Sequence, residues 1–407
     1  RSVHIVHLVH AVHGRLAMAG AVLRHWSGPR GAAGRTEQVK ILHVYKDFDP
    51  PVRGGIERHM ALMCRFQRAW AEVEALTCSG GPRSRMVDRD GTRVTEAGEW
   101  GRVQGAPAAP SFPWRIRQSG ADVVVVHVPN PTAELSCLIA PPRGVIVARY
   151  HSDVVRQASA MRFYRPALMR FLRRAAVVLP TSQRYLETSP VLREIPERCR
   201  VVPLGILPEE FDAPDPARVA ALRAEHGGDF VLFSGRHRYY KGLPVLLEAA
   251  KAIRARVVVA GDGPEREAAR AQAAQLGVDA VFPGPLGHDD LVAHLHACAV
   301  FAFPSVERSE AFGISILEAH ACGRPVVATK LGTGVEYANL DGETGVNVPP
   351  RDPAALAEAV NALLADPARR EALGAFARER VRREFDARNV ARAEYEEYLR
   401  ALESTRT

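Results

Sequence analysis

The chain has 407 residues, of which 47% are hydrophobic and 25% charged, a composition typical of a globular protein long enough for two domains. The formal net charge is +8, and the excess lies in the first 200 residues, which hold 30 lysines and arginines against 16 acidic residues. These basic residues form no clustered tract interleaved with aromatic residues, so we expect no nucleic-acid binding.

Apolar segments and cysteines indicate the cellular setting. No apolar run approaches the ~18 to 20 residues of a membrane-spanning helix, and the first residues lack the regions of a signal peptide. The six cysteines form no CxxC pair, which argues against a zinc site and against a disulfide framework. We therefore expect a cytoplasmic protein with reduced, packed thiols at Cys64, Cys78, Cys137, Cys199, Cys298 and Cys322.

The first 37 residues differ from the rest of the sequence. His4, His7, His10 and His13 recur every three residues, and a glycine-rich stretch then interrupts any regular structure. Because a spacing of three rotates successive helical side chains by ~60°, the four histidines would not converge on one metal ion. We expect residues 1–37 to be a poorly ordered extension or an upstream start-site artefact.

Strand and helix patterns alternate from Val39 onward. Short apolar runs predict buried strands, and segment 54–67 predicts a helix between the first two. Alternation of this kind implies a parallel sheet with right-handed crossovers. The strands expected in this half are 39–45, 73–79, 122–128, 145–152 and 175–182.

A second alternating set follows segment 199–217, which is rich in proline and aspartate and typical of a link between domains. Its helices are expected to begin near Leu243, Glu265, Asp289 and Gly313. Its strands are expected at 230–236, 256–263, 280–284, 299–305 and 325–329. The fold class is therefore α/β, with two doubly wound, Rossmann-like parallel-sheet domains that face each other across a cleft. Ligands of such sheets bind outside the carboxyl ends of the strands.

A basic loop follows the first strand of the second domain. It contains Arg236 and Lys241 just before a helix, and two cations beside a helix amino end can clamp a diphosphate. Taken alone, such a loop is more often a solvated basic surface. Backbone N–H groups near Gly313, and near Gly54 and Gly55 in the first domain, can bind the same anion.

Two glutamates flank the later helix, in the segment SEAFGISILEA at 309–319. Glu310 precedes the helix, and Glu318 lies on its second turn, ~12 Å further along the axis. Carboxylates accept hydrogen bonds from sugar and ribose hydroxyls. With a diphosphate bound nearby, we expect Glu310 to hold a sugar and Glu318 to hold the ribose of the same nucleotide.

Five motifs in the order GGIE, HSD, GRxxxxKG, GDGP and E-x7-E resemble family 4 of the retaining glycosyltransferases, which have the two-domain B-type fold. The resemblance implies a hexosyltransferase that uses a UDP- or GDP-linked sugar donor, no cofactor and no metal. It also implies the domain boundaries: an N-terminal acceptor-side domain at 38–205, a nucleotide-sugar-binding domain at 206–384, and a final helix at 385–407 that crosses back onto the first domain.

The same resemblance assigns roles to individual residues. Arg236 and Lys241 bind the donor diphosphate, Glu310 the sugar and Glu318 the ribose. His151 joins Arg236, Lys241 and Glu310 as a catalytic residue, although a lone histidine is more often structural and only its companions favour a role. The donor-binding residues implied by the resemblance are Gly54, Gly55, Gly235, Phe312, Gly313, Ile314, Ser315 and Glu318.

Some features depart from the family or fit other functions. Thr333 stands between two glycines in LGTGVEY, where many members have glycines near the donor sugar, so the sugar stays open. Asp47-Phe48-Asp49 and Asp88-Arg89-Asp90 match the manganese-binding DxD motif of the other glycosyltransferase fold, but so short a motif occurs by chance.

Three other classes of protein are weaker alternatives. A glycosidase needs two acids across a sugar, whereas Glu310 and Glu318 come from one element. AGDGPER lacks the third glycine of a dehydrogenase fingerprint. A sugar-nucleotide-binding protein without turnover is the alternative from another class, and it would not hydrolyse the donor.

The motifs do not identify the acceptor. Family members with a basic first domain often extend lipid-linked saccharides, so we expect a lipid-linked acceptor of cell-envelope polysaccharide synthesis, with a soluble acceptor as the alternative. Segment 161–175, MRFYRPALMRFLRRA, combines five arginines with aromatic and aliphatic residues and contains no acid. It is either an ordinary basic surface helix or a peripheral contact with an anionic membrane, at the inner face of the cytoplasmic membrane.

Overall fold

The structure, a computed structural model, describes residues 38–52, 54–103, 105–153 and 158–405. The histidine-rich segment 1–37, for which we predict an extension, lies outside the described residues. Val39–Thr407 forms one compact unit, and the domain boundaries at 205 and 384 stay predictions.

Seven strands form the first sheet, in the order β3-β4-β2-β1-β7-β8-β9. All neighbouring pairs are parallel except β3 and β4. The five strands predicted for this half are present, and β3 and β4 were not predicted. The strands are β1 (Lys40–Val44), β2 (Glu72–Cys78), β3 (Arg85–Arg89), β4 (Thr92–Ala97), β7 (Val123–Val128), β8 (Val145–Tyr150) and β9 (Val177–Pro180).

The unpredicted pair is a β-hairpin closed by a two-residue turn. Asp90 and Gly91 both have positive φ, 50° and 76°, which is the backbone of the tight turn that matches the twist of paired strands. Asp88 Oδ1 accepts a hydrogen bond from the Gly91 N–H at 2.9 Å. The second DxD match is therefore part of this turn. A shorter hairpin follows, β5 (Arg102–Val103) with β6 (Ala106–Pro107).

Six strands form the second sheet, in the order β12-β11-β10-β13-β14-β15, and all of its neighbouring pairs are parallel. The five predicted strands are present, and β15 was not predicted. The strands are β10 (Phe230–Ser234), β11 (Arg256–Ala260), β12 (Ala280–Gly284), β13 (Val300–Phe303), β14 (Val326–Thr329) and β15 (Gly345–Val348).

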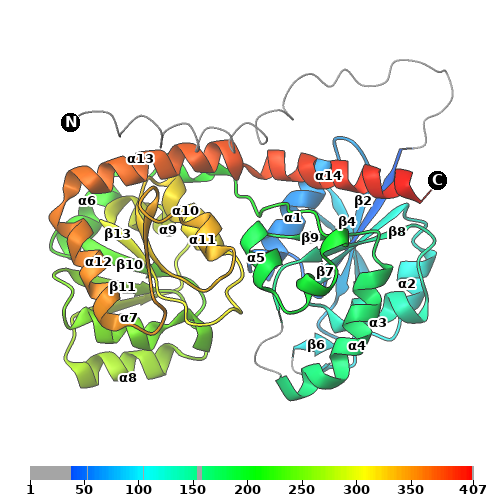
Figure 1. Ribbon diagram of the computed structural model, residues 1–407, viewed down its shortest axis with the longest axis horizontal. Helices are drawn as coiled ribbons and strands as arrows, with labels where there is room; N and C mark the ends of the chain where they lie inside the picture. Colours follow the sequence, from blue (N-terminus) through cyan, green and yellow to red (C-terminus); the bar gives the residue numbers. More distant parts are fainter. Residues whose placement is uncertain (1–37, 53, 104, 154–157, 406–407) are drawn as a thin grey trace, which may run out of the picture. The chain divides into compact units, whose positions relative to one another are not determined.

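Helices cover both faces of each sheet, because the strands carry buried apolar side chains on both faces. On the first sheet, α1 and α14 pack on one face, and α2, α3 and α4 on the other (Figure 1). The two doubly wound parallel sheets confirm the predicted fold class. These helices are α1 (Gly55–Gln67), α2 (Phe112–Gln118), α3 (Pro131–Ile139), α4 (Ala158–Arg174) and α14 (Ala387–Ser404), with the short α5 (Gln183–Thr188) after β9.

On the second sheet, α6, α9, α10, α11 and α13 pack on one face, and α7, α8 and α12 on the other. The helices predicted near Leu243, Glu265, Asp289 and Gly313 are α7, α8, α9 and α10. The bounds are α6 (Pro216–Glu225), α7 (Leu243–Ala250), α8 (Arg266–Leu276), α9 (His288–Ala297), α10 (Ile314–Ala321), α11 (Val335–Ala338), α12 (Pro353–Ala365) and α13 (Pro367–Glu384). Short 3-10 turns also occur, including η1 (Leu192–Glu194), η3 (Pro208–Phe211) and η4 (Tyr239–Lys241).

Two sequence-level expectations about the whole chain have structural counterparts. All six cysteines are free and buried, as expected for packing residues. Within the described ranges, no helix is both long and apolar enough to span a membrane.

A buried arginine ties three parts of the chain together. Arg149 on β8 donates hydrogen bonds to the carbonyls of Leu179, Val202 and Pro203, each at 2.8 Å. Its Nε lies 2.8 Å from Glu394 Oε1 on α14, and neither side chain is exposed. Burial alone would raise the pKa of Glu394, but Arg149 holds that pKa well below its ordinary value. Strand β8, the predicted link and the last helix therefore meet at one guanidinium.

We predict that Glu394→Ala lowers the free energy of unfolding by about 3–5 kcal/mol at pH 7, because Arg149 would stay buried without its counter-charge. Since folding lowers the carboxyl pKa, the contribution is present at neutral pH and diminishes as the pH falls below 4.5, the ordinary pKa of this group. Urea denaturation measures the change. Glu396→Ala, on the half-exposed side of the same helix, is the matched control and should cost under about 1 kcal/mol. Equal losses in both variants would contradict the prediction.

Candidate functional site

The loop between β10 and α7 carries the two predicted cations. Gly235 has a φ of 155°, Arg236 is exposed, and Lys241 ends the turn η4. Lys241 Nζ lies 2.6 Å from Glu310 Oε2, and 4.9 Å from the centroid of the Phe303 ring. The structure thus brings Lys241 and Glu310, 69 positions apart in the sequence, into one ion pair.

This ion pair is nearly buried, with 12% of the Lys241 side chain and 10% of the Glu310 side chain exposed. Burial by itself lowers the pKa of Lys241, but the Glu310 carboxylate outweighs it, so the pKa stands above its ordinary value. The lysine is therefore charged at neutral pH and held in place beside the loop backbone.

Glu310 is positioned by two hydroxyl groups. Ser305 Oγ donates to Glu310 Oε2 at 3.2 Å, and Thr333 Oγ1 donates to the Glu310 carbonyl at 2.9 Å. Thr333 is fully buried, so the residue that departs from the family pattern fixes the loop that carries the glutamate. This hydrogen bond is a structural reason for a threonine at position 333, and the sequence alone did not suggest it.

Glu318 lies on α10, half-buried, as its predicted place on the second turn requires. Burial raises its pKa, while the charges of Arg58, His288 and Lys241 act to lower it. In the part of the chain that the structure describes, no side chain hydrogen-bonds to its carboxylate. Glu318 therefore keeps acceptor capacity for a ligand among basic neighbours.

The amino ends of α1 and α10 meet. A Cβ atom built on Gly55 would lie 3.1 Å from Ile314 Cδ1, so only glycine allows this approach without a shift of the isoleucine. Gly313 caps α10 with a φ of 87°, and a Cβ there would lie 2.9 Å from Phe303. Two helix amino ends with their unpaired N–H groups thus lie close to each other. Ser315, on the first turn of α10, is half-buried.

The structure limits how two of the predicted donor-binding residues could contact a ligand. The Phe312 ring is buried against Tyr337 and Phe385, with centroid distances of 6.4 and 6.0 Å, so only its backbone can contact a ligand. Gly54 is the N-cap residue of α1, and the carboxylate of Glu57 lies beside it. The N–H groups near Gly54 therefore already attract an anionic group.

His151 lies directly after β8 and is 4% exposed. Its Nε2 is 2.9 Å from His127 Nδ1, and its Nδ1 has no hydrogen-bond partner among the described residues. Burial lowers the pKa of His151 well below its ordinary value, with smaller effects from His59 and Arg149, so the ring is neutral.

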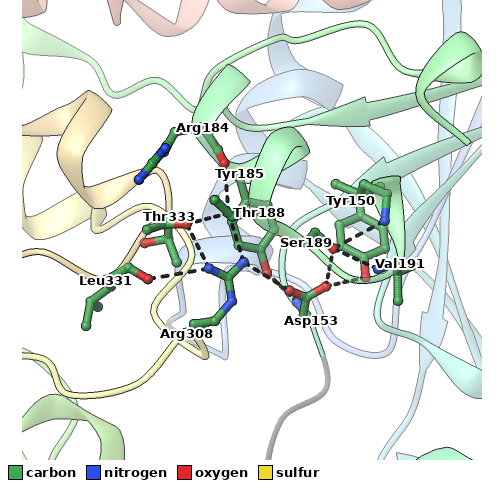
Figure 2. Close-up of polar contacts among 12 residues, drawn as sticks. Tyr150, Asp153, Arg184, Tyr185, Thr188, Ser189, Val191, Arg308, Leu331 and Thr333 are labelled. Carbon is green, nitrogen blue, oxygen red and sulfur yellow. Dashed lines mark hydrogen bonds and ion pairs between the residues drawn. The ribbon is translucent and has the colours of Figure 1, made fainter. Parts of the chain in front are cut away.

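Contacts between the two sheets' loops include a residue that sequence reasoning missed. Arg308 donates to Gly332 O at 2.8 Å and to Thr188 Oγ1 at 3.1 Å, and its Nη2 lies 3.5 Å from Asp153 Oδ2. Figure 2 shows Arg308 reaching from the Glu310 loop toward Asp153, next to Thr188. Asp153 is itself held by Tyr150, at 2.9 Å.

A sequence signal for this contact existed. Arg308 lies two positions before Glu310, and Asp153 is the last residue of the HSD motif, so one charged residue stood just before one motif and a residue of opposite sign stood in another motif of the same predicted site. Glu57, whose pKa is raised by burial and influenced by Lys46, Asp47 and Arg236, was also missed as a neighbour of the basic loop.

Neither DxD match offers two unengaged carboxylates. Asp47 accepts two hydrogen bonds from Arg102, at 2.8 and 3.1 Å, and Asp88 belongs to the β3–β4 turn. Within the ranges that the structure describes, no group of three or more histidines, cysteines or acids could hold a metal ion.

Known proteins resemble this chain in sequence and in fold. Residues 217–380 match the family described as "Glycosyl transferases group 1", and residues 54–205 match "Glycosyl transferase 4-like domain". The D-rhamnosyltransferase WbpZ of Pseudomonas aeruginosa is 36% identical over 86% of this chain and 93% of its own. The O-antigen chain mannosyltransferase C of Escherichia coli is 33% identical over 90% of this chain and 100% of its own.

Among solved structures, a sucrose-phosphate synthase from Thermosynechococcus elongatus has the same fold, with a TM-score of 0.77 and 23% identity over 90% of this chain and 100% of that one. The family matches cover both halves of the chain, and Lys241 and Glu310 both lie within the match at residues 217–380. The protein therefore belongs to the glycosyl transferase group 1 family and is a glycosyltransferase of the two-domain B-type fold.

Proposed function

We propose that the protein is a retaining, metal-independent glycosyltransferase that moves a hexose from a UDP- or GDP-linked donor to a lipid-linked saccharide of cell-envelope polysaccharide synthesis. The observation that carries this proposal is the Lys241–Glu310 ion pair. It combines a cation suited to a phosphate with a carboxylate suited to sugar hydroxyls, next to the amino end of α10.

In this proposal, positive charge on the protein stabilises the leaving group. Cleavage of the bond between sugar and diphosphate leaves negative charge on the departing oxygen. Lys241, Arg236 and the N–H groups near Gly313 supply complementary charge, and since Lys241 and the N–H groups are held in place, they need little reorganisation during the reaction. Because these groups do the work of a divalent cation, transfer is expected to continue in excess EDTA.

Retention places few other demands on the protein. An acceptor that attacks from the side of the leaving group, through an oxocarbenium-like transition state, needs orientation and exclusion of water rather than a protein nucleophile. Glu310 then orients the sugar, with its carboxylate fixed by Ser305 and Lys241, while Glu318 holds the ribose. His151 approaches the donor from the first sheet.

The names of the two relatives that span nearly the whole chain support a polysaccharide acceptor, since one is an O-antigen chain mannosyltransferase and the other a D-rhamnosyltransferase. We propose that the enzyme works in the cytoplasm at the inner face of the membrane. A soluble acceptor is the second candidate. A protein that binds sugar nucleotides without turnover is the third, and hydrolysis of the donor in the absence of acceptor would eliminate it.

Segment 161–175 supplies a candidate membrane contact, although the structure leaves only some of its side chains available for that contact. Leu168, Met169, Phe171 and Leu172 are buried in the core, as the alternative of a surface helix requires. Arg165 and Arg173 pair with Glu194 of η1, so an acid outside the segment offsets part of its charge. The side chains of Arg162 and Phe163 lie outside the described residues.

What is left is a basic groove on α4, and two exposed apolar side chains lie on other helices of the same layer. Arg170, Arg173 and Arg174 line an open hollow of about 390 Å³ with Pro166. Trp114 on α2 and Ile139 on α3 are 59% and 70% exposed, on the same layer of helices as α4 (Figure 1). Arginines with an exposed tryptophan suit an anionic membrane surface, where each cation contributes about 1 kcal/mol.

For the leaving-group role, we predict that Lys241→Ala lowers kcat/KM for donor hydrolysis by about a hundredfold or more, because a charge aimed at the departing diphosphate is removed. Arg236→Ala should act in the same direction. Assays in excess EDTA with UDP- and GDP-sugars measure the loss. Lys251→Ala, at the exposed end of α7, is the matched control. Near-normal hydrolysis by folded Lys241→Ala would end the clamp assignment, and a strict requirement for manganese would end the metal-independent mechanism.

For the two carboxylates, we predict that Glu318→Ala weakens binding of the bare nucleoside diphosphate about tenfold, the worth of a charged hydrogen bond to ribose. Glu310→Ala should keep or tighten that binding, since Lys241 loses a competing carboxylate, yet should impair use of the intact donor. Calorimetry with UDP and GDP separates the two effects. Glu358→Ala, exposed on α12, is the control. The same loss in both site variants would show that the carboxylates do not divide the ligand.

For the membrane contact, we predict that the protein sediments with vesicles rich in anionic lipid at low salt and is released at high salt. The triple variant Arg170→Glu, Arg173→Glu and Arg174→Glu should lose this binding. A control with the same change of charge is Arg254→Glu, Arg270→Glu and Arg369→Glu, on exposed positions around the second sheet. If both triple variants bind alike, or wild type does not bind, a soluble acceptor becomes the better proposal.

A further inference from the structure

One guanidinium connects loops of the two sheets. Arg308 lies in the loop 304–313 between β13 and α10, and it donates hydrogen bonds to Gly332 O at 2.8 Å and to Leu331 O at 3.4 Å. On the first sheet it donates to Thr188 Oγ1 at 3.1 Å, and its Nη2 lies 3.5 Å from Asp153 Oδ2. Two loops of the second sheet and two segments of the first sheet therefore meet at one side chain (Figure 2).

The first sheet holds Asp153 by contacts of its own. Asp153 Oδ1 accepts hydrogen bonds from Tyr150 Oη at 2.9 Å and from Ser189 Oγ at 2.6 Å. The Asp153 N–H donates to Tyr185 Oη at 2.5 Å, and the Tyr185 ring centroid lies 5.5 Å from the guanidinium carbon of Arg308. Tyr150, Tyr185 and Ser189 are all buried. The position of Asp153 Oδ2 is therefore set by the first sheet independently of Arg308.

Among the described residues, Arg308 is the cation that pairs with Asp153. Only 7% of the Asp153 side chain is exposed, so water contributes little to the stability of its charge. A nearly buried carboxylate without a counter-charge is costly. Separation of the loops would leave Asp153 in that state, and the contact therefore favours the arrangement in which the loops of the two sheets meet.

The same guanidinium is tied to the glutamate of the proposed sugar site. Arg308 lies two positions before Glu310 in the chain. The Gly332 carbonyl that it binds precedes Thr333, whose hydroxyl donates to the Glu310 carbonyl at 2.9 Å. Glu336 accepts hydrogen bonds from the N–H groups of Gly332 and Thr333, each at 3.1 Å. A shift of the guanidinium would therefore reach Glu310 both along the chain and through Thr333.

Arginine suits this position because of its shape. A guanidinium directs its N–H donors in a fixed planar fork, so it can serve partners on two sides at once. Nη1 of Arg308 faces Gly332, whereas Nη2 faces Thr188 and Asp153. A single compact ammonium group would keep the charge but could not hold both sides in this geometry.

We propose that Arg308 is a positioning residue that sets the Glu310 loop for sugar transfer while Asp153 and Thr188 of the first sheet hold its guanidinium. The role of Glu310 rests on the proposed function, whereas the contact itself does not. In the described part of the chain, Lys241 and Glu318 hydrogen-bond neither to Arg308 nor to Asp153. Loss of the contact should therefore slow turnover of the donor without weakening the binding of its nucleotide.

The kinetic test changes both sides of the contact. Arg308→Gln and Asp153→Asn each remove one charge, and asparagine keeps the shape of the aspartate. We expect kcat for hydrolysis of UDP- or GDP-sugars to fall about tenfold in each variant, with binding of bare UDP or GDP within about twofold of wild type. The double variant should lose no more than either single variant, because both changes break one contact.

A matched control breaks an ion pair of the same loop within the second sheet. Arg351 Nη2 lies 3.5 Å from Glu307 Oε1, the same distance as in the pair of Arg308 and Asp153, and Arg351→Gln should leave kcat within about twofold of wild type. Three results would each overturn the proposal: losses no larger than in this control, losses that multiply in the double variant, or an equal loss of nucleotide binding.

Hydrogen exchange supplies a measurement that does not depend on activity. The Glu310 N–H donates to Glu307 O at 3.0 Å, so its exchange reports how firmly the loop is held. In the full chain, this exchange should quicken several-fold in Asp153→Asn and in Thr188→Val, although both changes lie in the first sheet. Thr188→Val removes only a hydroxyl from the end of α5, and it serves if Asp153→Asn does not fold. Exchange as slow as in wild type would overturn the positioning of Glu310 by the first sheet.

The proposed function and this inference fail in different ways. Near-normal hydrolysis by Lys241→Ala ends the function proposed for the ion pair, and that variant keeps both residues of the Arg308–Asp153 contact. Faster exchange in Asp153→Asn with an unchanged kcat overturns the role of Arg308 in turnover and leaves the assignment of Lys241 intact.

Discussion

The buried ion pair of Arg149 and Glu394 is the constraint on which the rest of the structure depends. The chain passes between its two sheets twice, once through the proline-rich link and once into α14. The guanidinium of Arg149 contacts both of these connecting segments. A buried arginine requires its counter-charge and its carbonyl partners together, because each unpaired group in the interior is costly. The pair thereby fixes where α14 lies on the first sheet.

The same carboxylate accepts a hydrogen bond from the Tyr398 hydroxyl in the core of the first sheet. Three buried histidines, His43, His127 and His151, are joined by hydrogen bonds in the same sheet, and burial keeps them neutral. On the second sheet, charge is arranged differently: Lys241 is nearly buried but keeps its proton because Glu310 lies 2.6 Å away. The buried polar groups of the first sheet are thus neutral histidines, whereas those of the second sheet form a preformed ion pair.

Contacts between the loops of the two sheets give this arrangement its geometry. Gly55 and Ile314 allow two helix amino ends to approach, and Arg308 links the Glu310 loop to Thr188 and Asp153 (Figure 2). Thr333 belongs to the same set, since its buried hydroxyl supports the Glu310 backbone. A residue that departs from a family pattern can therefore serve the loop rather than the ligand.

The sequence by itself determined the elements whose signals are local. Apolar runs located ten of the strands, the glycine before Ile314 located the start of α10, and five ordered motifs indicated the family. The β3–β4 hairpin also had a local signal in Asp90-Gly91, which was not recognised as a turn from the sequence. Only the tertiary structure decided which side chains meet: Lys241 with Glu310, Arg308 with Asp153, and three histidines from three strands. Such pairings depend on strand order and register, which bring residues from distant positions together, and a periodicity read along one strand carries no information about its neighbour.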